Sequence, residues 1–184
     1  MTFPIEIERL SGKSDIINII TREETLSGID IIRGKRIYLT GEVRSFNNKG
    51  GTGSRLVITV FAKEIEPSGS VNSGTCALTP PYDDADHNFI TLHGILCKPP
   101  TLRRTPLGRL ICDILLAVNR RYGRSDYLPC IAWGRTAQEL SSRDVGDSVC
   151  LLGRLQSRRY IKTTDDGSEE RTAYEVSVIS LDEE

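Results

Sequence analysis

The chain has 184 residues, of which 38% are hydrophobic and 27% are charged, a composition typical of soluble globular proteins. The longest apolar run has about five residues, far short of the roughly 20 that a helix needs to cross a bilayer. The acidic start MTFPIEIERL is also unlike a secretion signal. We therefore exclude a membrane protein and expect a cytoplasmic one.

Residues 1–66 contain short alternating segments that are separated by glycine-containing turns. The run PIEIER at residues 4–9 precedes the turn sequence GKSD at residues 12–15, and Gly34 and Gly41 lie seven residues apart. EVRS at residues 42–45, a polar hairpin turn around GGTG at residues 50–53, and a last alternating segment follow. This pattern predicts β-strands.

Residues 67–87 (PSGSVNSGTCALTPPYDDADH) are rich in Ser, Gly, Pro and Asp and have no sustained periodicity. Such a composition predicts a linker. We therefore expect two domains, at residues 1–66 and 88–184.

Five strand-like segments follow the linker, with a helical segment between the third and the fourth. The strands are expected at residues 89–97, 110–120, 126–133, 148–160 and 172–181, with a basic, proline-containing loop at 98–109 and a short helix and turn at 134–147. This order is that of the OB-fold, a five-stranded Greek-key barrel in the all-β class.

An internal duplication relates the two halves of the chain. GKSD at residues 12–15 matches GRSD at 123–126 at an offset of 111, and Gly34 and Gly41 match Gly146 and Gly153 at an offset of 112. The sequence thus predicts two OB-folds. Because Phe89 minus 111 falls before residue 1, the first OB-fold lacks the opening strand; either the chain start is truncated or that unit completes its sheet in another way.

Charge is strongly segregated along the chain, although its formal net charge is only −1. Residues 89–163 hold thirteen basic and five acidic side chains, whereas residues 164–184 hold one basic and eight acidic ones. Because the local field recruits a polyanion, the basic block is where we expect a nucleic acid to bind.

Strand alternation places aromatic and basic side chains on matching faces of that block. On the third expected strand, one face is apolar and the other carries Tyr127 and Trp133. On the fourth, the face opposite the apolar one carries Arg154, Arg158 and Tyr160. Rings that stack on bases and arginines that meet phosphates bind single strands without sequence preference. The predicted contacts are Arg103, Arg104, Arg120, Arg121, Tyr122, Tyr127, Trp133, Arg135, Arg154, Arg158 and Tyr160.

Other interpretations of these side chains stay open. Trp133 could belong to the core or to a subunit interface, and arginine-rich strand faces are often only solvated surfaces. No metal site is predicted, because the five cysteines form no CxxC pair and only two histidines are present. No cofactor is expected either.

The segments LLAVNRRYGRSDYLPCIAWGRTAQEL and GDSVCLLGRLQSRRY resemble the bacterial single-stranded DNA-binding protein family, as does the opening NFITLHGILCKPPTLRRTPLGR. The resemblance covers residues 88–181 and implies base-stacking roles for Tyr127, Trp133 and Tyr160, with Tyr122 near another such position. It also implies a homo-oligomer, since two-domain versions bring four OB-folds together in a dimer. The chain stops at SLDEE without the family's flexible acidic tail, which puts the recruitment of replication enzymes in doubt.

The first repeat departs from the binding pattern of the second. Tyr122, Tyr127, Trp133, Arg154 and Tyr160 correspond to Ser11, Ile16, Arg22, Glu42 and Asn48. We expect this repeat to supply mainly an assembly surface.

The sequence suggests three classes of function, which differ in their partners and chemistry. The preferred one is single-strand binding and protection in replication, recombination or repair. The alternative is an OB-fold accessory module of primosome type with mainly protein partners. An enzyme is not expected, because no phosphate-binding loop, nucleophile elbow or Ser/His/Asp set is present.

Overall fold

The computed structural model describes residues 1–26, 28–48, 56–67, 86–164 and 167–182. The chain divides into two compact units, Met1–Arg44 with Thr59–His87, and Ser45–Ile58 with Asn88–Glu184. The predicted linker lies almost entirely outside the described residues, as does the predicted GGTG turn. The domain boundaries at residues 66 and 88 therefore remain predictions.

The first repeat forms a four-stranded sheet with the order β1-β2-β4-β3. Its elements are β1 (Thr2–Glu8), β2 (Ser14–Ile20), the 3₁₀ turn η1 (Glu24–Leu26), β3 (Ile37–Asn47) and β4 (Leu56–Pro67). Phe3, Ile17, Ile19, Ile58, Ala62 and Ile65 supply its buried apolar side chains.

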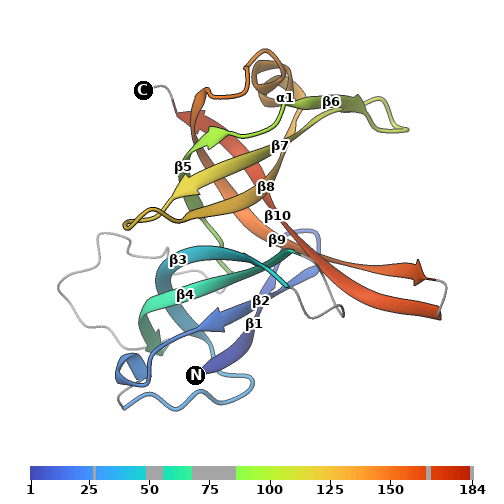
Figure 1. The fold of residues 1–184 in the computed structure, drawn as a ribbon. Coiled ribbons are helices and arrows are strands. Elements are labelled where there is room, and N and C mark those ends of the chain that lie inside the picture. The colour runs from blue at the N-terminus through green and yellow to red at the C-terminus, as the bar shows by residue number, and fades with distance from the viewer. Residues whose placement is uncertain (27, 49–55, 68–85, 165–166, 183–184) are drawn as a thin grey trace. The chain divides into compact units, whose positions relative to one another are not determined.

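The second repeat forms a six-stranded sheet with the order β5-β9-β10-β8-β7-β6 (Figure 1). Its elements are β5 (Ile90–Leu96), β6 (Thr101–Arg104), β7 (Leu110–Asn119), β8 (Ser125–Trp133), α1 (Gly134–Ser141), β9 (Ser148–Thr164) and β10 (Gly167–Asp182). An additional pairing of β5 with β7 closes the barrel. The predicted strands and helix of this repeat are confirmed.

The duplication extends to the register of the strands. Adding 111 to each number converts the β1–β2 register, Thr2↔Ile20 to Glu8↔Ser14, into the β7–β8 register, Asp113↔Ile131 to Asn119↔Ser125. The parallel pairings Ile20↔Phe61 and Ile131↔Ser177 also correspond. Within the described residues, no strand of the first sheet corresponds to β5, as the sequence predicted.

Close packing explains why glycine recurs at the second anchor of each repeat. A Cβ atom on Gly153 would lie 2.7 Å from the carbonyl oxygen of Ser177, and a Cβ on Gly41 would clash with the carbonyl oxygen of Phe61. Both glycines therefore let two strands approach one another at a position where no side chain fits.

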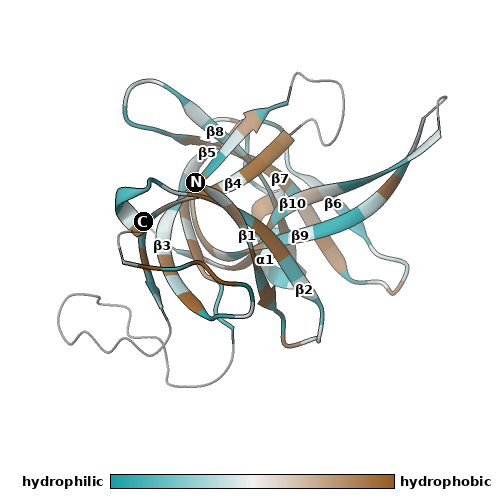
Figure 2. Cartoon of the chain, turned by 90° about the horizontal axis from the view of Figure 1, so that it is seen from below, coloured by the Kyte–Doolittle hydropathy of each residue, from teal (hydrophilic) through white to brown (hydrophobic). Residues whose placement is uncertain are grey.

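Side chains that alternate along the strands of the second repeat build its core, and Figure 2 shows the hydropathy of the residues along these strands. Inward positions of five strands are occupied by Leu92, Leu96, Cys112, Ile114, Leu116, Leu128, Cys130, Ala132, Val149, Leu151, Leu155, Val176 and Val178, all buried. Helix α1 adds Ala137 and Leu140, which lie one turn apart on its buried side.

Two elements differ from the sequence-based expectation. The predicted loop contains β6, which pairs with β7 although all four of its residues are exposed. The β9–β10 hairpin runs four residues further on β9 and five on β10 than predicted, and extends beyond the barrel in Figure 1. In both places backbone hydrogen bonds hold the strands, so no apolar alternation was there to reveal them.

Candidate nucleic-acid interface

The outer face of β8 carries the two predicted stacking rings of this strand. Tyr127 is 47% exposed and Trp133 is 43% exposed, whereas Leu128, Cys130 and Ala132 between them are buried on the inner face. At a rise of about 3.3 Å per residue, the two rings lie about 20 Å apart along the strand. The face is therefore long enough for several bases.

Arginines flank this row of rings on the same face. Ile131 of β8 pairs with Ser177 of β10, which pairs in turn with Arg154 of β9. Residues opposite each other on neighbouring strands share a face, so Arg154 lies about 10 Å from the row of rings, two strand spacings away. Arg158 and Tyr160 follow on β9 and are exposed too.

On the other side of the rings, β6 places Arg103 on the face that holds Trp133. Arg103 pairs with Ile111, which pairs with Trp133. Its Nε donates to Oδ2 of Asp113 at 2.5 Å, and this hydrogen bond is the largest cause of the raised pKa of Arg103. Arg103 would therefore have to share its charge between Asp113 and a phosphate.

The hairpin tip between β7 and β8 holds the next predicted contacts. Tyr122 is 98% exposed and has a backbone φ of 76°, in the left-handed region that bulky residues rarely adopt. Arg121 beside it is exposed as well. The tip thus presents a ring and a cation to solvent.

Arg120 is differently placed from its neighbours. Its Nε donates to Oδ2 of Asp126 at 2.6 Å, and its Nη2 donates to the carbonyl oxygen of Ser45 at 3.2 Å. Asp126 is only 1% exposed. The Arg120 side chain is thus engaged by a buried carboxylate, unlike the exposed Arg121 beside it.

The remaining predicted contacts lie away from the row of rings. Arg104 faces the opposite side of β6 from Arg103, and its Nη1 donates to the carbonyl oxygen of Gly108 at 3.3 Å. Arg135 is exposed in the first turn of α1. The structure therefore gathers Tyr127, Trp133, Arg154, Arg158, Tyr160 and Arg103 on one sheet face, and distributes the others around it.

The corresponding face of the first repeat carries different side chains at the positions of Trp133 and Arg154. Arg22, which corresponds to Trp133, lies over the ring of Phe61 with 5.8 Å between the guanidinium carbon and the ring centroid. Glu42, which corresponds to Arg154, accepts hydrogen bonds from Lys63 and Arg44. The bond from Lys63 is the largest cause of the lowered pKa of Glu42. Two cations are thus held by a carboxylate of the chain itself.

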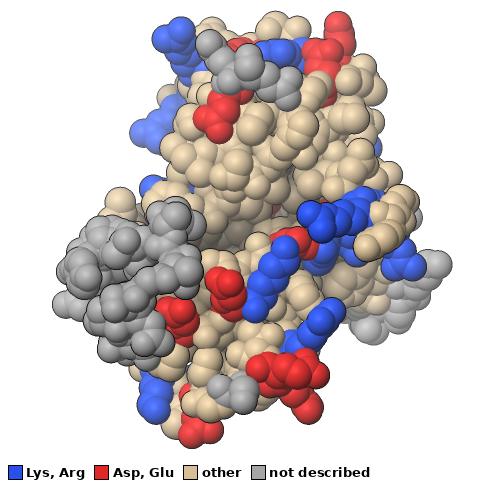
Figure 3. Space-filling view, turned by 90° about the vertical axis from the view of Figure 1, so that its left-hand side faces the viewer, with Lys and Arg blue, Asp and Glu red and all other residues tan. Residues whose placement is uncertain are grey.

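Charge is mixed on the face of the molecule that Figure 3 shows. Lys and Arg side chains on the face seen in Figure 3 stand in short groups with Asp and Glu beside them. Basic and acidic side chains thus lie close together on this face, in agreement with the net charge of −1.

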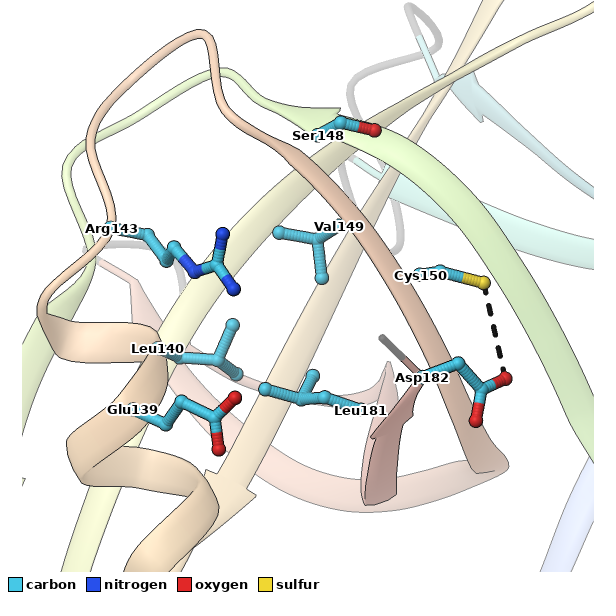
Figure 4. A pocket seen from close by; sticks show the side chains of 8 residues that line it. All are labelled: Glu139, Leu140, Arg143, Ser148, Val149, Cys150, Leu181 and Asp182. Atoms are coloured by element: carbon cyan, nitrogen blue, oxygen red, sulfur yellow. Dashed lines mark hydrogen bonds between the residues drawn. The ribbon is translucent and has the colours of Figure 1, made fainter. Parts of the chain in front are cut away.

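A pocket of about 440 Å³ lies in the second repeat between α1, the start of β9 and the end of β10 (Figure 4). It is lined by Glu139, Leu140, Arg143, Ser148, Val149, Cys150, Leu181 and Asp182. This set shares no residue with the predicted single-strand contacts.

The part of the chain that the structure describes was searched for metal-binding groups and for membrane-spanning helices. No group of three or more His, Cys, Asp or Glu side chains there could hold a metal ion. None of the helices in that part is long and apolar enough to span a membrane.

Residues 87–182 match the single-strand binding protein family, and the chain belongs to this family. Proteins of this family are DNA-binding proteins and not enzymes. The match coincides with the second repeat, which carries the row of rings and the flanking arginines.

Individual relatives support this assignment. The chain is 30% identical over 100 residues to the single-stranded DNA-binding protein of Oceanobacillus iheyensis, a match that covers 50% of this chain and 59% of that protein. It is 35% identical over 80 residues to the single-stranded DNA-binding proteins A and B of Bacillus subtilis, which covers 40% of this chain and 46% and 71% of those proteins. The chain thus spans about half the length of the first curated relatives it matches.

The fold of both repeats has a counterpart among solved structures. The wild-type single-stranded DNA binding protein of Thermus aquaticus superposes with a TM-score of 0.69 at 21% identity, covering 99% of this chain and 78% of that one. A deletion mutant of the same protein gives a TM-score of 0.68. This likeness confirms the predicted tandem OB-fold architecture.

Sequence reasoning missed the polar contacts that hold the hairpin tip. Asp126 and Ser45 were not singled out, although the structure joins both to Arg120. One signal was available, since Arg9 and Asp15 recur as Arg120 and Asp126 at the offset of 111, and the first pair also bonds, at 2.7 Å. A repeated Arg–Asp pair beside a turn indicates a structural role.

Proposed function

We propose that this chain binds single-stranded DNA without sequence preference through the outer face of β8 and β9. The observation that carries the proposal is the row of half-exposed rings, Tyr127 and Trp133, with Arg154 and Arg158 on the same face. Each base offers a flat face to a ring, and stacking contributes about 1–3 kcal/mol per base. The arginines meet phosphates, which are the same for every sequence.

Tyr160 and Tyr122 extend this surface in the proposal. Tyr160 lies on the part of β9 that leads into the exposed hairpin, and Tyr122 lies at the tip between β7 and β8. Both would stack on bases that leave the central row. Arg121, Arg104 and Arg135 would then contact the phosphate chain around the edges of the barrel.

A binding mode of this kind suits the protection of unpaired strands during replication, recombination or repair, in the cytoplasm at the nucleoid. We expect a homo-oligomer, with two chains combining four OB-folds. Light scattering measures this mass directly, and a monomer at micromolar concentration would contradict that part of the proposal.

The decisive experiment is a titration of the full chain with oligo(dT), followed by tryptophan fluorescence. Trp133 is the only tryptophan, so its emission reports on one place in the surface. Stacking should quench this emission, whereas a duplex of equal length should leave it almost unchanged. If oligo(dT) neither quenches Trp133 nor binds in an anisotropy assay, the accessory module with protein partners becomes the better explanation.

A further inference from the structure

A serine of the first repeat is bonded into the hairpin of the second repeat that carries Tyr127. Ser45 of β3 is only 7% exposed and belongs to the same compact unit as β7 and β8. Its Oγ accepts a hydrogen bond from the backbone N–H of Tyr127 at 2.7 Å. Its own N–H donates to Oδ1 of Asp126, and its carbonyl oxygen accepts from Arg120 at 3.2 Å.

These bonds reach a stretch of β8 that its neighbouring strand leaves unsupported. Strand β10 pairs with β8 only at Cys130 and Ile131. Closer to the hairpin tip, β8 is held by β7 on one side. The hydroxyl of Ser45 therefore fixes the Tyr127 backbone where sheet pairing with β10 has ended.

The Asp126 carboxylate makes this attachment rigid. It is 1% exposed and receives two hydrogen bonds from Arg120 in addition to the one from Ser45. A buried carboxylate with three donors has little freedom to move, because each lost bond would leave a charge without compensation. Asp126 and Tyr127 are consecutive, so the backbone at the base of the Tyr127 ring is fixed by two adjacent residues.

We infer that Ser45 is a positioning residue for base stacking on Tyr127. The inference rests on the proposed function: Ser45 does not contact DNA, but holds the backbone from which a stacking ring projects. A residue of the first repeat thereby takes part in strand binding, although Ile16 and Arg22 stand where the second repeat has Tyr127 and Trp133.

The residues that attach the hairpin occur in both repeats, whereas the aromatic residue beside them occurs in one. Arg9 and Asp15 form the corresponding pair in the first repeat, and Ser157 corresponds to Ser45. The Arg–Asp pair and the serine are thus common to both halves of the sequence. Only in the second is the aspartate followed by an aromatic ring, since Ile16 corresponds to Tyr127.

The test compares Ser45→Ala with Ser45→Thr in the full chain, with Ser141→Ala as the matched control at the end of α1. Binding to labelled oligo(dT) is measured by anisotropy, and folding by circular dichroism and urea unfolding. We expect Ser45→Ala to weaken binding about three- to tenfold, as the loss of one hydrogen bond implies. Ser45→Thr keeps a hydroxyl and should bind within twofold of the wild type, as should Ser141→Ala.

A double-mutant cycle distinguishes positioning from a general loss of stability. In a Tyr127→Ala background, Ser45→Ala should change the affinity less than twofold, because the ring it positions is gone. An equal loss in both backgrounds would overturn the inference, and so would wild-type affinity of a folded Ser45→Ala variant. If Ser45→Ala does not fold, Ser45→Thr decides: a threefold or larger loss despite the hydroxyl contradicts the inference, and wild-type affinity supports it.

The failure of the proposed function would look different. In that case the wild-type chain itself would not bind oligo(dT), whatever residue stood at position 45.

Discussion

The two repeats share their strand registers and a buried ion pair, and they differ in the side chains that they expose. The β1–β2 and β7–β8 registers are the same, and the ion pairs Arg9–Asp15 and Arg120–Asp126 occupy the same places. On the outer face, by contrast, Arg22 stands where Trp133 stands in the second repeat. Buried contacts and tight turns thus fix the fold, while the exposed face varies without affecting it.

The largest expected effect tests the buried ion pair that the two repeats share. Arg120→Ala leaves the buried Asp126 without its cation, and Arg9→Ala does the same to Asp15, whose side chain is 2% exposed. Removing one partner of a buried ion pair costs about 3–5 kcal/mol of stability. We expect losses of this size for both variants in urea unfolding followed by circular dichroism.

The exposed Arg124→Ala is the control for this comparison and should unfold at the wild-type urea concentration. A large loss of stability for only one of the two ion pairs would show that the pairs do not stabilise their repeats equally.

The next effect tests the exposed face. Trp133→Ala should weaken binding to oligo(dT) by about 1–3 kcal/mol, because a stacking platform is lost while the inner face of β8 is unchanged. Arg22→Ala at the corresponding place of the first repeat should change the affinity much less. Anisotropy with a labelled oligonucleotide measures both, and Trp133→Phe should retain most of the affinity.

Equal losses for Trp133→Ala and Arg22→Ala would show that the Arg22–Phe61 pair also binds bases. The first repeat would then be a second binding surface and not mainly an assembly surface.

A smaller effect concerns phosphates. The logarithm of the binding constant should fall with the logarithm of salt concentration at a slope of about −0.7 per phosphate neutralised. Arg154→Ala should make that slope shallower by about 0.7. Glu42→Ala should leave it unchanged, because the released Lys63 and Arg44 lie outside the proposed contact surface of β8 and β9. An unchanged slope for Arg154→Ala would remove this arginine from the surface.

Much of this arrangement could be predicted from the sequence, because it depends on periodicity. Alternation placed Leu128 inside and Trp133 outside, and the repeated GKSD and GRSD turns gave the duplication. Subtracting the repeat offset of 111 from residue 89 also predicted that no strand of the first sheet within the described residues would correspond to β5.

Long-range polar contacts could not be predicted in this way. Ser45 and Asp126 are 81 residues apart, and no periodicity connects them. Arg103 and Asp113 meet only because β6 forms within a segment whose prolines indicated a loop. Composition shows that an arginine is available, whereas only the fold shows whether a carboxylate of the same chain already holds it.

The smallest expected effect separates the two hairpin tips. Tyr122 adopts a φ of 76°, whereas Ser11, the corresponding residue, is not among the described residues with positive φ. The left-handed conformation costs a non-glycine residue roughly 1–2 kcal/mol, of which the greater chain entropy of unfolded glycine would offset about half. Tyr122→Gly should therefore stabilise the protein by about 0.5–1 kcal/mol in urea unfolding, while Ser11→Gly should not.

The same variant should bind oligo(dT) more weakly, since the ring at the tip is lost. Stability and binding would thus move in opposite directions at Tyr122, which is expected where a strained conformation serves to present a side chain. If Tyr122→Gly gains stability and keeps full affinity, the ring has no part in strand binding and the surface ends at Tyr127. If it loses stability instead, contacts of the ring with its own chain outweigh the strain, and the tip is a structural feature in both repeats.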